Sequence, residues 1–342
     1  MSIETTPVHH ITPIPADFKS TVASVAAQWP AIAAHVEDLM TARTIRNVYL
    51  VGSGASYFAT WPARYLLDAR GGGLAAWHLT SGEFVAHPPS RIGQDTLVIA
   101  ASHTGHTAET LRAAHHAADA GAAVAAITRD QDSPLAEVAD AAFCYATNSA
   151  IVESRMVLFQ HFAHALTRTG PDDWATDSAT LPDALHASKT EIARTATDLA
   201  ERLTKEELVY VVGAGASFGV ANALACCYLQ EMQWMHAAAL PGADFFHGPF
   251  EAVTGTTPVV VLLAEDNSRS ISQRALRFLQ RHSDNVLTLD SADLTLPGVP
   301  LRARAELSTF ALASAARRVV DHVAAVRGHA LNTRRYMHRV DY

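Results

Sequence analysis

Cysteine is scarce in this chain of 342 residues, and its three cysteines form no recognisable framework. Cys226 and Cys227 are adjacent, Cys144 stands far from both, and no Cys-x-x-Cys spacing occurs. Disulfide frameworks and thiolate zinc sites need several cysteines at regular spacings. We therefore expect neither, and we expect the three thiols to be buried as small apolar side chains.

The sequence also lacks the segments that direct a chain into or across a membrane. No apolar run approaches the length of about 18 residues that a membrane span needs. Residues 1–15 show no basic start followed by an apolar stretch, so no signal peptide is predicted. We expect a cytoplasmic protein with no membrane partner.

Positive charge is in short supply as well. Lys and Arg number 26 against 34 Asp and Glu, which gives a formal net charge of −8. Proteins that bind nucleic acids present a concentrated basic surface, so we expect no nucleic-acid partner. Hydrophobic residues make up 49% of the chain, enough for two sizeable cores, and the length suits two domains.

A repeated segment divides the chain into two comparable halves. Residues 48–57 read Val-Tyr-Leu-Val-Gly-Ser-Gly-Ala-Ser-Tyr, and residues 209–218 read Val-Tyr-Val-Val-Gly-Ala-Gly-Ala-Ser-Phe. The two copies begin 161 residues apart, a spacing that suits duplication of a whole domain. In each copy an apolar run precedes a glycine turn and a helical stretch, which predicts a buried parallel strand followed by a helix.

Both halves alternate strands with helices. The strands expected beyond the repeat are 96–101, 122–128, 141–145, 258–263 and 285–289, and the helices are 107–120, 152–167, 182–203, 218–236, 270–282 and 306–326. This alternation predicts βαβ units and parallel sheets. The expected fold class is α/β, with two tandem domains that each contain a five-stranded parallel sheet flanked by helices, an αβα sandwich.

Composition suggests where these domains begin and end. Residues 1–45 are expected to form an N-terminal helical arm, bent near Pro30, before a first domain over 46–175. Residues 170–178 are polar and helix-poor, so the linker is placed there. The second domain then covers 176–328, and 329–342 is expected to be a C-terminal tail that folds over the active site.

A cluster of hydroxyl groups follows the predicted strand 96–101. Ser102, Thr104 and Thr107 surround Gly105 and open a predicted helix. Hydroxyls and the unpaired N–H groups of a helix start can together hold a phosphate, and glycine permits a close approach of the backbone. An ordinary helix cap with spare hydroxyls is the alternative. The matching strand of the second half ends in Glu265 and Asp266, so one phosphate site per chain is expected.

An acid and two histidines occupy a short segment of the second half. Glu231 lies on a predicted apolar helix, where a carboxylate suits acid–base work. His247 precedes Gly-Pro and is expected on a turn, and imidazole titrates near neutrality. The alternatives are a solvated helix face for Glu231 and an ordinary turn histidine for His247. His236 and Asp244 are expected to be structural.

These motifs resemble those of the double sugar-isomerase (SIS) domain family. The shared marks are Gly-Ser-Gly-x-Ser after the first strand and Ser-x-Ser/Thr-Gly-x-Thr after a later strand, and the resemblance runs from about residue 36 onward. It implies two tandem SIS domains in which a cradle holds the sugar phosphate. The implied phosphate-binding residues are Ser53, Ser56, Ser102, His103 (through its backbone), Thr104 and Thr107. His106 stands where the family usually has glutamate.

The same resemblance extends to the acid–imidazole segment. It implies that Glu231 is the acid/base of enolisation and that His247 opens the sugar ring or serves as a second acid/base, with active sites shared across a homodimer. Phe-Phe-His-Gly-Pro-Phe-Glu and the tail Thr-Arg-Arg-Tyr-Met are closer to the fructosamine-6-phosphate deglycases than to the isomerase half of glucosamine-6-phosphate synthase. Possible tail contacts are Arg335, Tyr336 and Arg339, with Arg339 near the position of a functional lysine in the synthase.

The function expected is that of a deglycase. It would split a fructosamine 6-phosphate into glucose 6-phosphate and a free amine, through enolisation and hydrolysis of an imine. The alternatives are an amino-sugar-phosphate deaminase/isomerase acting on a hexosamine 6-phosphate and a non-catalytic sugar-phosphate regulator. No cofactor and no metal are expected, because His103 and His106 have no third ligand nearby in the sequence.

Overall fold

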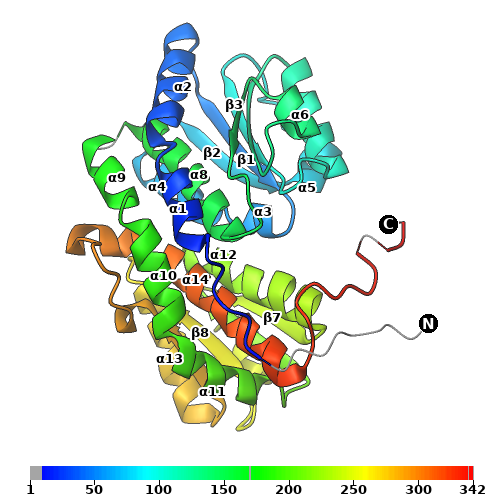
Figure 1. Cartoon of the computed structure of the whole chain (residues 1–342), viewed down its shortest axis with the longest axis vertical. Coiled ribbons are helices and arrows are strands. Elements are labelled where there is room, and N and C mark those ends of the chain that lie inside the picture. Colours follow the sequence, from blue (N-terminus) through cyan, green and yellow to red (C-terminus); the bar gives the residue numbers. More distant parts are fainter. Residues whose placement is uncertain (1–9, 169–170, 338, 342) are drawn as a thin grey trace. The chain divides into compact units, whose positions relative to one another are not determined.

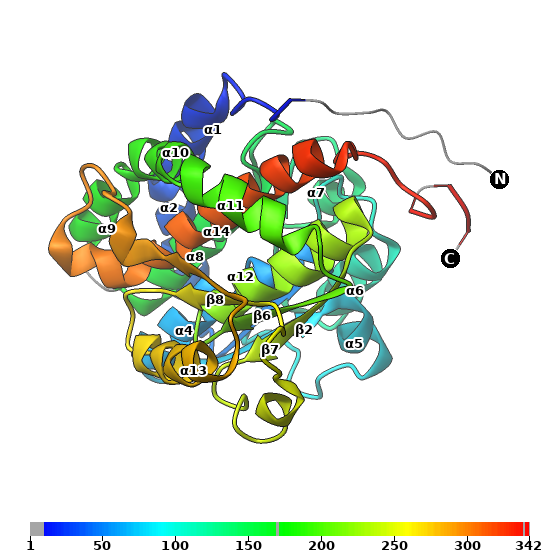
Figure 2. The same cartoon turned by 90° about the horizontal axis from the view of Figure 1, so that it is seen from below.

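The computed structural model describes residues 10–168, 171–337 and 339–341. Its contacts divide the chain into two compact units. The N-terminal unit comprises Pro15–Asp183 with Gly298–Pro300, and the C-terminal unit comprises Ala184–Pro297 with residues 10–14 and the chain from Leu301 onward. Each unit is an α/β structure built on its own parallel sheet, as Figures 1 and 2 show.

The sheet of the N-terminal unit has five parallel strands in the order β2-β1-β3-β4-β5. These are β1 (Asn47–Gly52), β2 (Ala75–Thr80), β3 (Thr96–Ala101), β4 (Ala123–Thr128) and β5 (Ala141–Cys144). The predicted strands 96–101, 122–128 and 141–145 are therefore confirmed. The edge strand β2 escaped prediction because its half-exposed sequence lacks the continuous apolar run of a central strand.

Helices cover both faces of this sheet (Figure 1). On one face α5 (Ser81–Ala86), α6 (Ala108–Asp119) and α7 (Pro134–Val138) contribute Phe84, Ala113 and Leu135 to the core. On the other face lie α4 (Trp61–Arg70) and α8 (Ile151–Thr167), with α1 (Phe18–Ala26) and α2 (Trp29–Ala42) packed against α8. The short helix α3 (Ala55–Phe58) follows β1. The expected arm is thus two helices of this unit, interrupted just before Pro30.

The prediction that residues 170–178 form a helix-poor linker is wrong. Pro171–Ser178 forms helix α9, and the boundary between the units falls at Asp183, within α10 (Leu181–Glu191). Trp174 explains why this polar stretch is ordered: its side chain is buried and stacks on His164 of α8, with ring centroids 4.1 Å apart. Burial of this one aromatic side chain stabilises a helix in a stretch whose polar composition predicted a loop.

The sheet of the C-terminal unit has four parallel strands in the order β7-β6-β8-β9. They are β6 (Leu208–Gly213), β7 (His236–Pro241), β8 (Val259–Leu263) and β9 (Val286–Asp290), so the order repeats β2-β1-β3-β4 of the other unit. Five strands were predicted, and among the described residues the fifth is absent. After β9 the chain forms η3 (Ser291–Asp293) and then a loop with Pro297 and Pro300, which cannot continue a ladder.

Helices also cover both faces of this second sheet (Figure 2). One side carries α11 (Ala193–Leu203), α12 (Ser217–Asn222), the π-helix η1 (Ala223–Met232) and α14 (Leu301–Arg327). The other side carries α13 (Arg269–His282) and the 3-10 turn η2 (Pro249–Ala252), which enclose a core around Phe245.

The predicted helix 218–236 ends four residues early. It continues from α12 into η1 and stops at Met232, and Trp234 adopts a left-handed φ of 52°. His236 therefore begins strand β7 instead of ending a helix. Within the described residues, no helix is long and apolar enough to cross a membrane.

The cysteines are not uniformly buried. Cys227 is buried and Cys144 is half-buried, as expected of small apolar side chains, but Cys226 is exposed on η1. A hydrogen bond with Cys227 lowers the pKa of Cys226 to about 7, against the opposing effects of burial and of the Glu231 charge.

Candidate active site

The predicted phosphate cradle lies where β3 ends and α6 begins. Ser102 is buried, and its Oγ lies 2.8 Å from Thr107 Oγ1. Thr107 is the residue that caps α6, yet its side chain makes no capping hydrogen bond to the helix. Thr104 is exposed at the tip of the turn, where its Oγ1 accepts the His106 N–H at 3.3 Å. The Thr107 hydroxyl is therefore not consumed in capping the helix, and the helix start at this turn has N–H groups that an anion can use.

Gly105 is required by the shape of this turn. Its φ is +71°, and a Cβ added there would lie 2.5 Å from the Ser133 Cβ and 2.6 Å from its Oγ. Only glycine combines a left-handed backbone with such a close approach. The turn is thus held against the start of α7, which sets the positions of Thr104 and Thr107.

Ser53 and Ser56 lie on the neighbouring turn. Gly52 of β1 pairs with Ala101 of β3, so the two turns leave the same edge of the sheet side by side. Ser53 is half-buried, and Ser56 is buried and accepts a hydrogen bond from Arg155 Nη1 at 2.5 Å. The structure therefore brings all the predicted phosphate-binding residues of this unit to one sheet edge.

Arg155 is the residue of this edge that the sequence analysis missed. It comes from α8, is only 5% exposed, and also donates from Nε to the Ile151 carbonyl at 3.2 Å. A buried guanidinium beside Ser56 supplies a local positive charge in a chain whose formal net charge is −8. The sequence gives no specific signal for it, because residues 152–167 also contain Glu153, Gln160 and two histidines.

The His103 side chain is engaged away from the turn's backbone. Its Nδ1 lies 2.9 Å from the Tyr145 hydroxyl, and its Nε2 lies 3.1 Å from Asn148 Oδ1. The imidazole also stacks on the Tyr145 ring. Burial, reinforced by the charge of Arg155, lowers the pKa of His103 to about 4. The imidazole is therefore neutral at physiological pH and adds no charge to the cradle.

The predicted acid, Glu231, lies one residue before the C-terminal end of the π-helix η1. π-Helical segments are rare and concentrate at functional sites. Here the π-helix η1 includes the turn that carries the Glu231 carboxylate. Its Oε1 accepts a hydrogen bond from Arg334 Nη2 at 2.8 Å. Arg334 belongs to the C-terminal tail and was not among the tail contacts expected from the sequence.

His247 lies on a turn, as predicted. The turn follows β7, and the His247 N–H donates to the Asp244 carbonyl at 2.9 Å. Gly248 has a φ of +139°, a backbone that side chains rarely adopt, so the Gly-Pro that follows the histidine fixes the exit of the chain into η2. His247 and Asp244 are both exposed.

The C-terminal tail folds back on the end of η1. Gln233 donates to the His329 carbonyl at 3.0 Å, and the Arg335 guanidinium lies 4.3 Å from the centre of the Trp234 ring. Tyr336 and Arg339 are exposed, with the Arg339 N–H bonded to the Tyr336 carbonyl at 2.8 Å.

A sequence profile of the SIS domain matches residues 43–165. The fructosamine deglycase FrlB of Bacillus subtilis (strain 168) is 30% identical over 320 residues, which cover 91% of this chain and 97% of the relative. This chain belongs to the SIS-domain family.

Further comparisons agree with this membership of the SIS family. The fructoselysine 6-phosphate deglycase of Escherichia coli (strain K12) is 28% identical over 78% of this chain and 79% of its own length. The crystal structure of a candidate phosphosugar isomerase from Bacillus subtilis superimposes with a TM-score of 0.86 at 27% identity, covering 96% of this chain and all of that one. This SIS protein is an enzyme of the sugar-phosphate isomerase and deglycase type.

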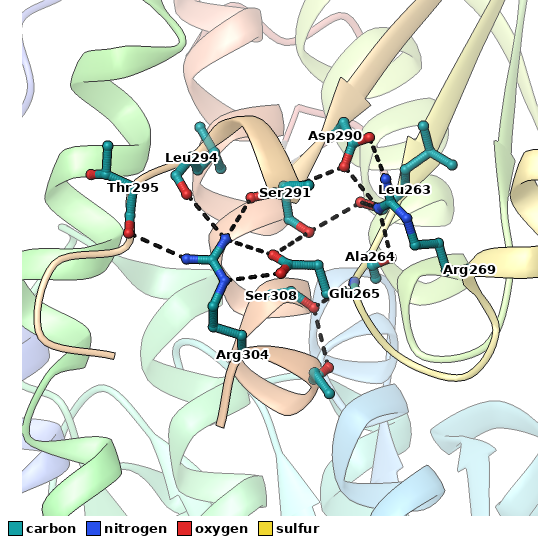
Figure 3. A network of polar contacts seen from close by, with 12 residues as sticks. Leu263, Ala264, Glu265, Arg269, Asp290, Ser291, Leu294, Thr295, Arg304 and Ser308 are labelled. Carbon is teal, nitrogen blue, oxygen red and sulfur yellow. Dashed lines mark hydrogen bonds and ion pairs between the residues drawn. The ribbon is translucent and has the colours of Figure 1, made fainter. Parts of the chain in front are cut away.

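In this SIS protein, carboxylates occupy the turn of the C-terminal unit that corresponds to the cradle. Figure 3 shows Glu265, just after β8, held by Arg304 through two hydrogen bonds of 2.8 and 2.9 Å. Arg269, the first residue of α13, forms a second bidentate pair with Asp290 at 2.6 and 2.8 Å. The cations near this turn are thus already paired within the protein.

The helix start at this turn is satisfied by the chain itself. Asp266 Oδ1 accepts hydrogen bonds from the Ser268 N–H at 2.8 Å and from its hydroxyl. The carboxylate takes the donors that a phosphate would need and repels an anion. Among the described residues, no group of three or more His, Cys, Asp and Glu side chains is placed to hold a metal ion.

Proposed function

We propose that this SIS protein is a deglycase that splits a fructosamine 6-phosphate, the phosphorylated Amadori adduct of an amine or amino acid, into glucose 6-phosphate and the free amine. The observation that carries the proposal is the coexistence, in one chain, of a hydroxyl-lined turn at Ser102–Thr107 and a carboxylate at Glu231 that is fixed by a hydrogen bond. Two deglycases are among the relatives, one of them matched over nearly its whole length.

The phosphate is held by local donors. The hydroxyls of Ser102, Thr104 and Thr107 and the first N–H groups of α6 bind the phosphoryl oxygens, with Ser53 and Ser56 on the adjacent turn. Arg155 adds a buried positive charge through its contact with Ser56. Binding at the 6-phosphate orients the sugar, and orientation is worth several kcal/mol to a reaction at C1 and C2.

The proton transfers need only an acid and a base. His247 assists opening of the sugar ring, after which Glu231 takes the proton from C1 and the electrons of that bond form the enaminol. Protonation at C2 then leaves an imine at C1, water adds to it, and the C1–N bond breaks to release the amine. The sum is fructosamine 6-phosphate plus water to glucose 6-phosphate plus amine, with no redox change.

Two further features accompany this proposal. The repeated strand order β7-β6-β8-β9 supports a second SIS domain in the C-terminal unit, although the profile covers only residues 43–165. A cytoplasmic homodimer that shares its active sites is proposed from the family resemblance.

Mass spectrometry of the products tests the reaction. We expect a panel of fructosamine 6-phosphates to give glucose 6-phosphate and the intact amine, and Glu231→Gln to abolish turnover while sugar-phosphate binding persists. Release of ammonia from a hexosamine 6-phosphate would instead establish a deaminase. Binding without turnover of any substrate, in the wild-type protein, would establish a regulator.

A further inference from the structure

A tail arginine is hydrogen-bonded to the proposed catalytic carboxylate. Arg334 Nη2 lies 2.8 Å from Glu231 Oε1, and the two side chains are 20% and 27% exposed. The residues are 103 positions apart in the sequence. An ion pair that is largely withdrawn from water is stronger than one on the surface, because screening by solvent and salt is weaker there.

The Arg334 side chain is held in one place by the tail around it. Its Nη1 donates to the Leu331 carbonyl at 2.7 Å and to the Thr333 carbonyl at 3.1 Å. The tail itself is attached to η1 by Gln233, which donates to the His329 carbonyl. The guanidinium therefore meets Glu231 as a preorganised donor and not as a flexible surface cation.

Arg334 contacts the carboxylate directly, and further charged groups lie on the elements packed against η1. On α14, which packs against η1, Arg317 and Arg318 both pair with Asp321. Further titratable groups lie on η1, on the elements that contact it and on the tail. They include Cys226, Cys227 and Tyr228 of η1, Tyr210 of β6, His236 of β7, His322 and Arg327 of α14, and His329 and Arg335 of the tail.

We propose that Arg334 is a positioning residue that keeps Glu231 ionised and aimed as the base of the reaction. The inference rests on the proposed function, since it assigns a task to the base of that reaction. A neighbouring positive charge favours the carboxylate over the protonated acid, and a bonded Oε1 restricts rotation of the carboxyl group. The C-terminal tail thereby belongs to the catalytic apparatus through one contact.

The test compares Arg334→Met with Arg334→Lys in the full chain. We expect Arg334→Met to lower kcat/KM at pH 7 on the order of 10- to 100-fold and to move the acid limb of the pH–rate profile upward by roughly one to two pH units. Arg334→Lys, which keeps the charge, should leave that limb near its wild-type position even if the rate falls. Arg281→Met, which removes an exposed arginine of α13, is the matched control and should change neither quantity.

The outcomes separate this inference from the proposed function. An acid limb that stays in place in Arg334→Met, with the rate reduced or not, overturns the positioning role even though the deglycase activity stands. If Arg334→Met does not fold, an acid limb that moves upward in Arg334→Lys, despite the retained charge, overturns it as well. Full activity of Glu231→Gln would show, in contrast, that Glu231 is not the base. That result would refute the proposed mechanism itself, whatever the Arg334 variants do.

Discussion

Three histidines of the N-terminal unit, the buried His161 and the half-buried His78 and His103, lie in surroundings that keep the imidazole neutral. Burial lowers the pKa of His78 and of His103 to about 4, and that of His161 to about 3. His161 has the most specific partners: its Nε2 donates to the Val25 carbonyl at 3.1 Å, and its Nδ1 accepts the Trp174 indole N–H at 2.8 Å. Protonation of Nδ1 would remove that acceptor.

This burial makes stability depend on pH in a defined direction. The pKa of His161 lies below its ordinary value of 6.5, so the unfolded chain takes up a proton that the folded site refuses. The stability is fully present above about pH 6.5 and is lost as the pH falls toward 3. When the pH falls from 7 to 5, His161 alone should lower the free energy of unfolding by about 2 kcal/mol.

Urea unfolding of His161→Asn at pH 5, 6 and 7 checks this expectation. The variant should be less stable than wild type at pH 7, because the site loses packing, yet it should lose less stability on going to pH 5. His115→Asn removes an exposed histidine of α6 and should leave the pH dependence as it is in wild type. Equal pH slopes for wild type and His161→Asn would contradict the assignment.

Two arginines show what sequence reasoning could and could not find at the scale of residues. Ser102, Thr104 and Thr107 were identifiable because a strand, a glycine and a helix start are adjacent in the sequence. Arg155 and Arg334 were not, because their partners Ser56 and Glu231 lie 99 and 103 residues away. A contact between such distant residues is created by packing and leaves no local pattern.

The Arg304 side chain makes several of the hydrogen bonds that attach the loop after β9 to the C-terminal unit. Besides its two hydrogen bonds to Glu265, Arg304 of α14 donates to the carbonyls of Ser291, Leu294 and Thr295 at 3.1 to 3.3 Å (Figure 3). This loop occupies the place in the chain where a fifth strand was expected. Its carbonyls find in the guanidinium the donors that a neighbouring strand would have supplied.

Arg304→Met should therefore destabilise the protein by about 2–4 kcal/mol, because a half-buried carboxylate loses its cation and three carbonyls lose the hydrogen bonds that the guanidinium donates. Chemical denaturation measures the change. Arg112→Met is the control, since the Arg112–Glu109 pair on α6 is exposed and its atoms are 3.4 Å apart; its loss should cost less than about 0.5 kcal/mol. Similar costs for the two variants would show that Arg304 does not hold the loop.

The whole molecule is asymmetric in chemistry although its two sheets share a strand order. The turn after β3 presents hydroxyls, whereas the turn after β8 presents the carboxylates of Glu265 and Asp266 with their partners in place. The shared strand order thus pairs the proposed phosphate site with a counterpart whose charges are neutralised within the protein. This asymmetry predicts a single phosphate site in each chain.

Calorimetric titration with glucose 6-phosphate tests that stoichiometry. We expect one site per chain, and we expect Thr104→Ala to weaken binding by about 1–3 kcal/mol if its hydroxyl bonds the phosphate. Ser268→Ala changes the corresponding turn of the C-terminal unit and should leave the affinity unaltered. Two sites per chain, or equal effects of the two substitutions, would refute the asymmetry.

The sequence by itself determined the parallel α/β character of both halves, the hydroxyl turn and the acidic character of its counterpart, because each depends on residues close together in the chain. Only the tertiary structure decided that the second sheet has four strands, that 171–178 is helical, and that Arg334 meets Glu231. Those outcomes depend on which distant surfaces bury one another. Trp174 finds its partner on α8, and the prolines after β9 exclude a further strand, so packing and backbone chemistry prevailed where composition pointed elsewhere.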